Sequence, residues 1–340
     1  MLEKFPRSAL WSDERGRPYI DQLGRDLELL KSKLGHDGSI VSELGGKRIR
    51  ITRKSAGIYT AIAASSDTDR INSKKIMGAE VNAILSAAPA IEASVTTAEQ
   101  RTRRLIHNLK SLTAKTNQEI FNLVQQNAMM ASPREMVAYA SGEIARAPDE
   151  TAKALIEILK HQAAQKAEYS SFEKLSGRVS SIRHEQHEIH RVIMNVLYLF
   201  YSEFVDKKVR FVVDSTNLKA LFDYESIHVC IYYLIENAAK YTMRNSVLNI
   251  TFAEDGRGMV DIRFSMESLA VDPDEEDSVF NEGVSGRRAE SNKLSGSGLG
   301  LYLAREMAAL NRGSLFLHAG KAIIGSTYAR NTFVLSLKAI

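Results

Sequence analysis

The sequence predicts an α+β protein made of three consecutive parts. Two long helical stretches with almost no glycine occupy the middle of the chain, and helices alternate with strand-like segments in the C-terminal half. A smaller segment of mixed character comes first. We therefore expect a small mixed unit over residues 1–90, a helical hairpin over residues 91–185 and a layered α/β sandwich over residues 186–340.

Size and composition are those of a globular protein with more than one domain. The chain has 340 residues, of which 44% are hydrophobic and 25% charged. This length exceeds the usual single-domain size and favours about two or three domains. No apolar run reaches the roughly 18 residues that a membrane-spanning helix needs, and the N-terminus lacks the layout of a secretion signal. We expect a cytoplasmic protein with no membrane partner.

Net charge and cysteine content exclude further classes. A net charge of +4 is too small to indicate a nucleic-acid partner without a concentrated basic patch. Cys230 is the only cysteine, so an internal disulfide is excluded. Because Cys230 stands in an apolar run, we expect a buried core thiol rather than a nucleophile.

The first unit carries one helix signal and one hairpin signal. Leucines at helical spacing predict a helix over residues 21–34, and Gly45-Gly46 before an alternating segment predicts a β-hairpin. We interpret the basic segment 47–53 as a solvated edge strand rather than a nucleic-acid surface. No chemistry is assigned to this unit, for which a sensory, docking or dimer-tuning role is the default hypothesis.

The middle of the chain predicts two long helices, over residues 91–130 and 152–181. Ser132 followed by Pro133 is typical of a capped start for a shorter helix between them. The first long helix has a narrow apolar seam formed by Leu105, Leu109, Leu112, Thr116, Ile120 and Leu123. A hairpin with one such stripe cannot bury it alone, so we expect a homodimer whose two hairpins form a four-helix bundle.

The C-terminal part predicts alternating elements. Helices are expected over residues 190–204, 226–242 and 300–310, and strands near residues 209–214, 247–252, 259–264, 314–318 and 332–337. Residues 272–295 are rich in polar residues and glycine and are expected to form a mobile loop.

Two motifs in this part can bind a phosphate and a cation. Asn237 and Lys240 lie three residues apart in a predicted helix, so both side chains share one face. About 60 residues on, Gly296, Gly298 and Gly300 open another helix, where the absence of Cβ atoms lets free N–H groups approach a phosphate. A dinucleotide-binding fold is not indicated, because a polar loop rather than a buried strand precedes the glycines. For Asn237 the alternative is a satisfied structural amide.

The paired motifs, with Phe280 between them, resemble the N-box, G2-box and F-box of sensor histidine kinases. The resemblance covers roughly residues 92–338 and implies an ATPase domain of the histidine kinase, gyrase and Hsp90 type. It further implies that Asn237 coordinates the Mg²⁺ that bridges the ATP phosphates. Lys240 would lie near the phosphates and Tyr241 beside the base. The phosphate loop would consist of Gly296, Gly298 and Gly300.

Charged residues of the predicted loop leave two readings open. Arg287, Arg288 and Lys293 could help to neutralise the phosphates, or they could belong to a solvated charged loop.

The sequence departs from the family at the base-reading position. The family has Asp-x-Gly-x-Gly after a strand, and its aspartate accepts a hydrogen bond from the adenine amino group. The aligned residues here are Met266, Ser268 and Ala270. Losing a charged acceptor should weaken ATP binding by about 1.5 to 3 kcal/mol, or about 10- to 150-fold. Glu267 cannot replace it, because it would point to the opposite face of the strand.

His107 is the candidate phosphoacceptor. It lies about 200° around the helix from Leu105 and so faces away from the apolar seam. An imidazole there can attack the γ-phosphate and later transfer the phosphoryl group to an aspartate. The family places an acid after this histidine as base and a proline five residues on, where this chain has Asn108 and Leu112. A surface histidine without function is the alternative.

Three further histidines, His184, His187 and His190, do not form a zinc-peptidase motif. That motif needs two histidines four residues apart with a glutamate beside the first, and the spacing here is three. We expect a solvated helical linker.

The resemblance implies a soluble sensor histidine kinase that autophosphorylates His107 with ATP and Mg²⁺. The phosphoryl group would then pass to an aspartate of a response-regulator receiver domain. The alternative is a degenerate relative that binds ATP poorly and acts as a phosphotransferase or scaffold. An ATP-gated clamp of the gyrase type is disfavoured, because such clamps need a further domain after the ATPase.

Overall fold

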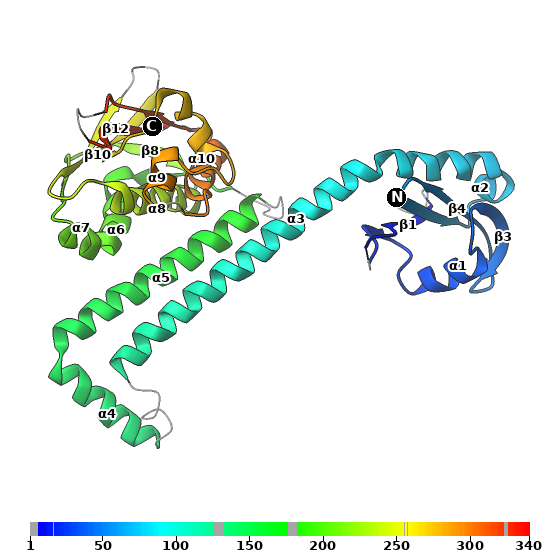
Figure 1. Ribbon diagram of the computed structural model, residues 1–340, viewed down its shortest axis with the longest axis horizontal. Coiled ribbons are helices and arrows are strands. Elements are labelled where there is room, and N and C mark those ends of the chain that lie inside the picture. The colour runs from blue at the N-terminus through cyan, green and yellow to red at the C-terminus, as the bar shows by residue number, and fades with distance from the viewer. Residues whose placement is uncertain are drawn as a thin grey trace. The chain divides into compact units, whose positions relative to one another are not determined.

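The α+β class is confirmed by the computed structural model. It describes residues 6–15, 17–124, 132–175, 182–254, 256, 258–294, 296–322 and 326–340. The chain forms two compact units, residues 1–104 and 105–340 (Figure 1).

The first unit is built on a five-stranded antiparallel sheet of order β2-β1-β5-β4-β3. The strands are β1 (Arg7–Ser12), β2 (Ile20–Asp21), β3 (Gly38–Leu44), β4 (Lys47–Ala56) and β5 (Tyr59–Ser65). The predicted hairpin is confirmed, since Gly45 and Gly46 join β3 to β4 with φ of 57° and 74°. Two successive positive φ values define the turn that matches the twist of a hairpin.

Helices cover both faces of this sheet. They are α1 (Leu27–Lys33), α2 (Thr68–Asn72) and the first half of α3 (Lys74–Leu123). Leu27 and Leu30 of α1 share a buried cluster with Ile51, whereas Met77 and Val81 of α3 pack with other strand residues. The predicted helix over residues 21–34 is therefore shorter, beginning with a 3₁₀ turn at Gly24–Asp26.

The edge-strand prediction for residues 47–53 is wrong. Strand β4 pairs with β3 on one side and with β5 on the other, so it lies inside the sheet. Two of its arginines donate hydrogen bonds to carbonyl groups near helix C-termini. Arg50 donates to the carbonyl of Ile71 at 2.7 Å, and Arg53 donates to the carbonyl of Gly35 at 2.9 Å. Carbonyls at helix C-termini lack partners within the helix and attract cations.

The hairpin consists of α3, α4 (Pro133–Arg146) and α5 (Pro148–Leu175). Helix α3 begins at Lys74, well before the predicted residue 91, and it contains Pro89. Helix α4 starts with the expected cap, in which Ser132 and Glu135 form a capping box. The predicted helix ends at residues 125–130 and 176–181 lie outside the described residues.

Helices α3 and α5 run antiparallel beside each other. Asn108 Nδ2 donates to Glu168 Oε1 at 3.2 Å, and Gln165 Nε2 donates to Thr113 Oγ1 at 3.3 Å. In the predicted seam only Thr116 is fully buried, and the other seam residues are half-buried. The four-helix bundle stays a prediction.

The second unit also contains a five-stranded sheet of order β11-β12-β10-β9-β7. The strands are β7 (Arg210–Val213), β9 (Val247–Glu254), β10 (Met259–Leu269), β11 (Ser314–His318) and β12 (Tyr328–Lys338). Among the described strands of this sheet, only β7 and β9 pair in parallel. A separate ribbon of β6 (Glu185–Glu188) and β8 (Lys219–Phe222) was not predicted.

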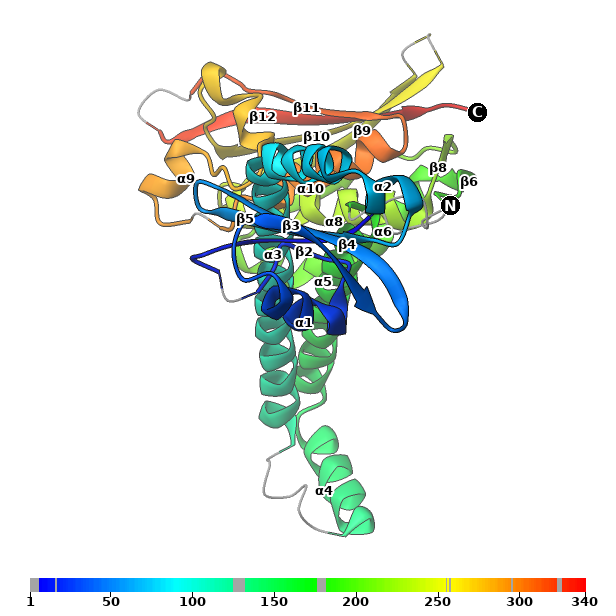
Figure 2. The same cartoon turned by 90° about the vertical axis from the view of Figure 1, so that its right-hand side faces the viewer.

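Helices pack on one face of this sheet (Figures 1 and 2). They are α6 (Ile189–Leu197), α7 (Tyr201–Asp206), α8 (Tyr224–Tyr241) and α10 (Gly300–Leu310), and the short helix α9 (Arg287–Ser291) precedes α10 in the chain. Helix α10 has the predicted bounds, whereas the predicted helix 190–204 is divided by a 3₁₀ turn at Tyr198–Phe200. Cys230 is completely buried in the core, as expected, and burial raises the pKa of its thiol.

A buried ion pair joins α5 to the start of α8. Lys174 Nζ lies 2.8 Å from Asp223 Oδ1, and the two side chains are 4% and 11% exposed. The same carboxylate accepts the N–H of Ser226 at 2.9 Å and so caps α8. Although burial opposes ionisation, the hydrogen bonds from Lys174 and Ser226 lower the pKa of Asp223 to about 2.

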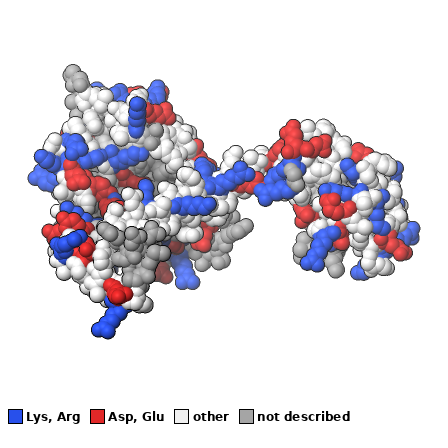
Figure 3. All heavy atoms as spheres, turned by 60° about the horizontal axis from the view of Figure 1, so that its bottom comes forward, with Lys and Arg blue, Asp and Glu red and all other residues white. Residues whose placement is uncertain are grey.

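Surface charges of both signs are mixed. On the face shown in Figure 3, Lys and Arg side chains alternate with Asp and Glu side chains over each unit. Within the described residues, no helix combines the length and the apolar character needed to cross a bilayer.

Candidate functional site

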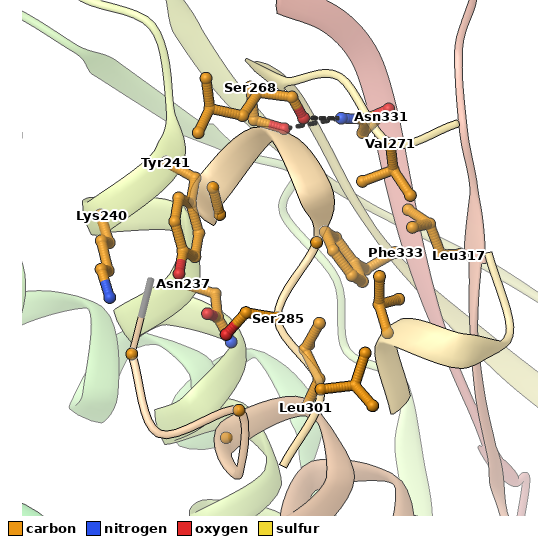
Figure 4. A pocket seen from close by; sticks show the side chains of 18 of the residues that line it. Asn237, Lys240, Tyr241, Ser268, Val271, Ser285, Leu301, Leu317, Asn331 and Phe333 are labelled. Carbon is orange, nitrogen blue, oxygen red and sulfur yellow. Dashed lines mark hydrogen bonds between the residues drawn. The ribbon is translucent and has the colours of Figure 1, made fainter. Parts of the chain in front are cut away.

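A cavity of about 310 Å³ lies between α8, β10 and the segment that leads into α10 (Figure 4). This volume is at the lower end of the range of about 300 to 1,000 Å³ found for small-molecule sites. The lining brings together all six of the predicted phosphate, metal and base contacts: Asn237, Lys240, Tyr241, Gly296, Gly298 and Gly300.

The orientation of Asn237 leaves its oxygen available. Its Nδ2 donates to the carbonyl of Tyr233, one helical turn earlier, at 2.8 Å. The amide is thus structurally anchored through nitrogen, while Oδ1 can face the cavity. A carboxamide oxygen is a suitable ligand for Mg²⁺. The structural and ligand-binding readings of Asn237 are therefore compatible.

Lys240 and Tyr241 bring α8 close to the glycine segment. The Nζ of Lys240 lies 5.1 Å from the centre of the Tyr241 ring, and the Tyr241 hydroxyl donates to the carbonyl of Leu294 at 3.1 Å. A Cβ placed on Gly296 would lie 3.1 Å from Lys240 Nζ. The ammonium group consequently stands directly beside the main chain of the glycine segment.

Of the three glycines in this segment, Gly298 has the least room for a Cβ atom. Its φ is 67°, and a Cβ there would lie 2.4 Å from the carbonyl carbon of Gly283. The N–H of Gly283 donates to the carbonyl of Gly298 at 3.1 Å, which holds the two loops together. At Gly300 a Cβ would meet Asn237 Nδ2 at 3.5 Å, an ordinary contact distance.

The other end of the cavity is mainly apolar. Met266 is 3% exposed, and its sulfur accepts a hydrogen bond from the Thr242 hydroxyl at 3.3 Å. The side chain forms part of the wall and leaves the cavity open. Glu267 belongs to the opposite side of β10, as the strand alternation predicts.

The segment predicted as a mobile loop contains short helices. These are 3₁₀ turns at Pro273–Glu275 and Ser278–Phe280, followed by α9. Arg287 pairs with Asp274 at 2.6 Å and Arg288 with Asp272 at 3.2 Å. These two arginines neutralise carboxylates of their own segment, whereas the role of Lys293 as a phosphate-neutralising residue stays a prediction. Phe280 is buried, with its ring centre 6.4 Å from that of Phe333.

Glu236 is a site residue that the sequence reasoning missed. It lines the cavity beside Asn237 with its side chain still exposed to solvent, and the neighbouring residues exclude enough water to raise the pKa of its carboxyl group to about 7. The signal that could have found it is its place in an apolar helix next to a candidate metal ligand. A carboxyl group with this pKa changes its charge near neutral pH, within reach of any bound anion.

The predicted phosphoacceptor region lies outside the cavity. His107 is exposed on α3 and is not part of the lining, whereas the Asn108 side chain faces α5 and bonds to Glu168. The expected orientation of His107, away from the seam, agrees with this exposure.

The three histidines near residue 187 are not on one helix, contrary to the prediction. His187 lies on β6, where its ring packs against Phe222 and Tyr224 with centre distances of 4.9 and 5.4 Å. In the described parts of the chain, no group of three or more His, Cys, Asp or Glu residues could hold a metal ion.

Comparisons with known proteins show which proteins the C-terminal part of the chain is similar to. Residues 222–339 match the family of histidine kinase-, DNA gyrase B-, and HSP90-like ATPases. A segment of 113 residues is 29% identical to the sensor-like histidine kinase SenX3 of Mycobacterium tuberculosis, covering 33% of this chain and 27% of SenX3. A segment of 83 residues is 30% identical to the histidine protein kinase SaeS of Staphylococcus aureus, covering 24% of each protein.

Solved structures give weaker likenesses. The mycobacterial sensor histidine kinase MprB has a TM-score of 0.40 and 18% identity, over 46% of this chain and 97% of that chain. The histidine kinase ThkA in complex with the response regulator TrrA has a TM-score of 0.41 and 12% identity, over 96% and 85%.

Residues 222–339 therefore form an ATPase domain of the histidine kinase, gyrase B and HSP90 type. Through this domain the chain is related to the sensor histidine kinases. The matched segments span about a quarter of the length of these curated relatives.

Proposed function

We propose that the protein is an ATP-dependent histidine kinase that phosphorylates His107 and passes the phosphoryl group to a receiver domain. The observation that carries this proposal is the convergence of Asn237, Lys240 and the glycine segment on one cavity. A helix-borne amide, an ammonium group and a loop without Cβ atoms together fit a triphosphate. The apolar end of the same cavity fits a base.

Each residue has a distinct task in this proposal. Asn237 Oδ1 would hold Mg²⁺, which when bound supplies positive charge to the phosphates. Lys240 neutralises further phosphate charge, and the glycine segment offers main-chain N–H groups. Phosphoryl transfer depends mainly on such positioning and charge neutralisation.

The chemical step follows from the nucleophile. A ring nitrogen of the neutral His107 imidazole attacks the γ-phosphorus, the bond to the bridging oxygen breaks, and ADP leaves. The proton on the other ring nitrogen is available for release to solvent or to a nearby base. In the second step an aspartate carboxylate of the receiver domain takes the phosphoryl group and restores the imidazole. Asn108 would only orient this region, since an amide is no base.

Labelling with γ-labelled ATP tests the assignment. We expect an acid-labile and alkali-stable label on the wild-type protein and none on His107→Gln. His161→Gln is the matched control, because His161 lies on the other long helix of the hairpin and should leave the label intact. A label that persists in His107→Gln would refute the role of His107.

A scaffold that binds ATP poorly is the second candidate. It is favoured by Met266, which stands where the family has its adenine-reading aspartate. Calorimetry with ATP and Mg²⁺ separates the two candidates, since the kinase requires measurable heat at millimolar ligand and the scaffold does not.

We also propose a homodimer formed through the hairpin. Ile106 of α3 and Leu155 and Leu159 of α5 are apolar but 49%, 52% and 59% exposed in the single chain. A second hairpin would remove these side chains from water. Light scattering should then give twice the chain mass of 37.8 kDa. The N-terminal unit would act as an input element on the same helix.

A further inference from the structure

The apolar end of the cavity contains one buried polar pair, formed by Ser268 and Asn331. The two residues are 4% and 1% exposed and lie on the neighbouring strands β10 and β12. Asn331 Nδ2 donates to Ser268 Oγ at 2.9 Å and to the carbonyl of Leu269 at 2.9 Å. Figure 4 shows the Asn331 side chain pointing toward Ser268, with both residues at the cavity wall.

The orientation of the Asn331 amide is fixed by its main-chain partners. The carbonyl of Leu269 can only accept, so it must face the nitrogen of the amide. The N–H of Gly320 can only donate, and it lies 3.2 Å from Asn331 Oδ1. The nitrogen therefore also faces Ser268, whose hydroxyl oxygen is an acceptor in this pair.

The Ser268 hydroxyl can still form hydrogen bonds to a ligand after its bond with Asn331. A serine hydroxyl has one proton to donate and two lone pairs. One lone pair is used by Asn331, so one donor and one acceptor remain for a group in the cavity. A carboxylate at the position of Met266 could only accept.

Purine bases differ at this point. Adenine offers an amino group, which donates, and 6-oxopurines offer a carbonyl oxygen, which accepts. At position 6 itself, a hydroxyl with both capacities can pair with the amino group or with the carbonyl oxygen, whereas an acceptor-only carboxylate pairs with the amino group and opposes the carbonyl oxygen. The remaining wall, which includes Met266, Leu317 and Phe333, is apolar and offers contact to any purine face.

We propose that Ser268, positioned by Asn331, reads the base, and that the site accepts 6-oxopurine triphosphates such as GTP and ITP about as well as ATP. This inference rests on the proposed function, because it assumes that the cavity binds a nucleoside triphosphate.

Calorimetry on the full chain with Mg²⁺ and ATP, GTP, ITP or tripolyphosphate tests the proposal. For the wild type we expect ATP and GTP affinities within about tenfold of each other. Ser268→Ala should weaken both purine nucleotides about three- to tenfold, because one hydrogen bond is lost, and leave tripolyphosphate unchanged. Ser265→Ala is the matched control, since Ser265 lies on the same strand but bonds to Thr332 at 2.9 Å.

A second variant tests whether the hydrogen-bonding character of this wall sets the preference between ATP and GTP. Met266→Asp installs an acceptor-only group, and we expect it to shift the ATP-to-GTP affinity ratio at least tenfold toward ATP. A wild-type preference for ATP above about tenfold, or unchanged purine binding in Ser268→Ala, would overturn the inference alone. If the wild type binds neither purine nucleotides nor tripolyphosphate, the proposed function itself fails.

Discussion

Gly298→Ala should damage the site far more than alanine at the neighbouring glycines. The added Cβ would lie 2.4 to 2.7 Å from three main-chain atoms of Gly283 and Val284. These main-chain atoms cannot move aside as easily as the end of a flexible side chain can. A positive φ costs a non-glycine residue about 1 to 2 kcal/mol, and overpacking adds about 1 to 3 kcal/mol. We expect the free energy of unfolding to fall by about 2 to 5 kcal/mol.

The same motif provides two controls. At Gly296 the new Cβ would meet only the mobile Nζ of Lys240 at 3.1 Å, so stability should change by less than about 0.5 kcal/mol. At Gly300 the contacts begin at 3.4 Å and the residue is helical, so alanine should be neutral or stabilise by up to about 1 kcal/mol.

Urea denaturation of the three variants measures these differences, and calorimetry with ATP and Mg²⁺ follows their effect on binding. We expect the displaced loop of Gly298→Ala to lower ATP affinity at least tenfold. Equal stabilities for Gly298→Ala and Gly296→Ala would refute the close approach between the two loops.

Two further predictions concern pH. Because the pKa of Glu236 is raised to about 7, the native state holds its proton more tightly, and stability should fall as pH rises from about 4.5 to 7. Glu236→Gln removes this fall and should be as stable as the wild type at pH 4 and more stable at pH 8, by at most about 1 kcal/mol because solvent screens the exposed side chain. A difference in stability that does not change with pH in urea titrations would contradict this. The pKa of Asp223 is lowered rather than raised, so the pH dependence runs the other way. The stability that ionised Asp223 contributes is present above about pH 4 and is lost as pH falls toward 2. Lys174→Met should therefore cost about 3 to 5 kcal/mol at pH 7 and less at pH 3, where the unpaired carboxyl becomes protonated. An equal cost at both pH values in denaturation curves would count against the pair.

Local patterns of sequence predicted the parts of the fold that depend on neighbours along the chain. The bounds of α10, the cap at Ser132 and the turn at Gly45 all follow from residues within one or two turns. The spacing of Asn237 and Lys240 likewise placed both on one helix face. These features need no knowledge of the tertiary structure.

Features that depend on pairing between distant segments were missed. The interior position of β4 depends on strand order, and the ribbon that contains His187 depends on a partner strand more than 30 residues later. The Ser268–Asn331 pair joins residues 63 positions apart, through a strand register that the sequence does not reveal. The raised pKa of Glu236 depends on the residues that surround it in the folded cavity, which is also a tertiary property.

The Lys174–Asp223 contact means that α8 is bound to α5 at one end and lines the cavity at the other. Asp223 precedes the first residue of α8, while Asn237 and Lys240 stand near its last turn. A helix of 18 residues is rigid over roughly 27 Å. Twisting or sliding of α5 would therefore move the first turn of α8, and the rigid helix would carry this movement to Asn237 and Lys240 in the cavity wall.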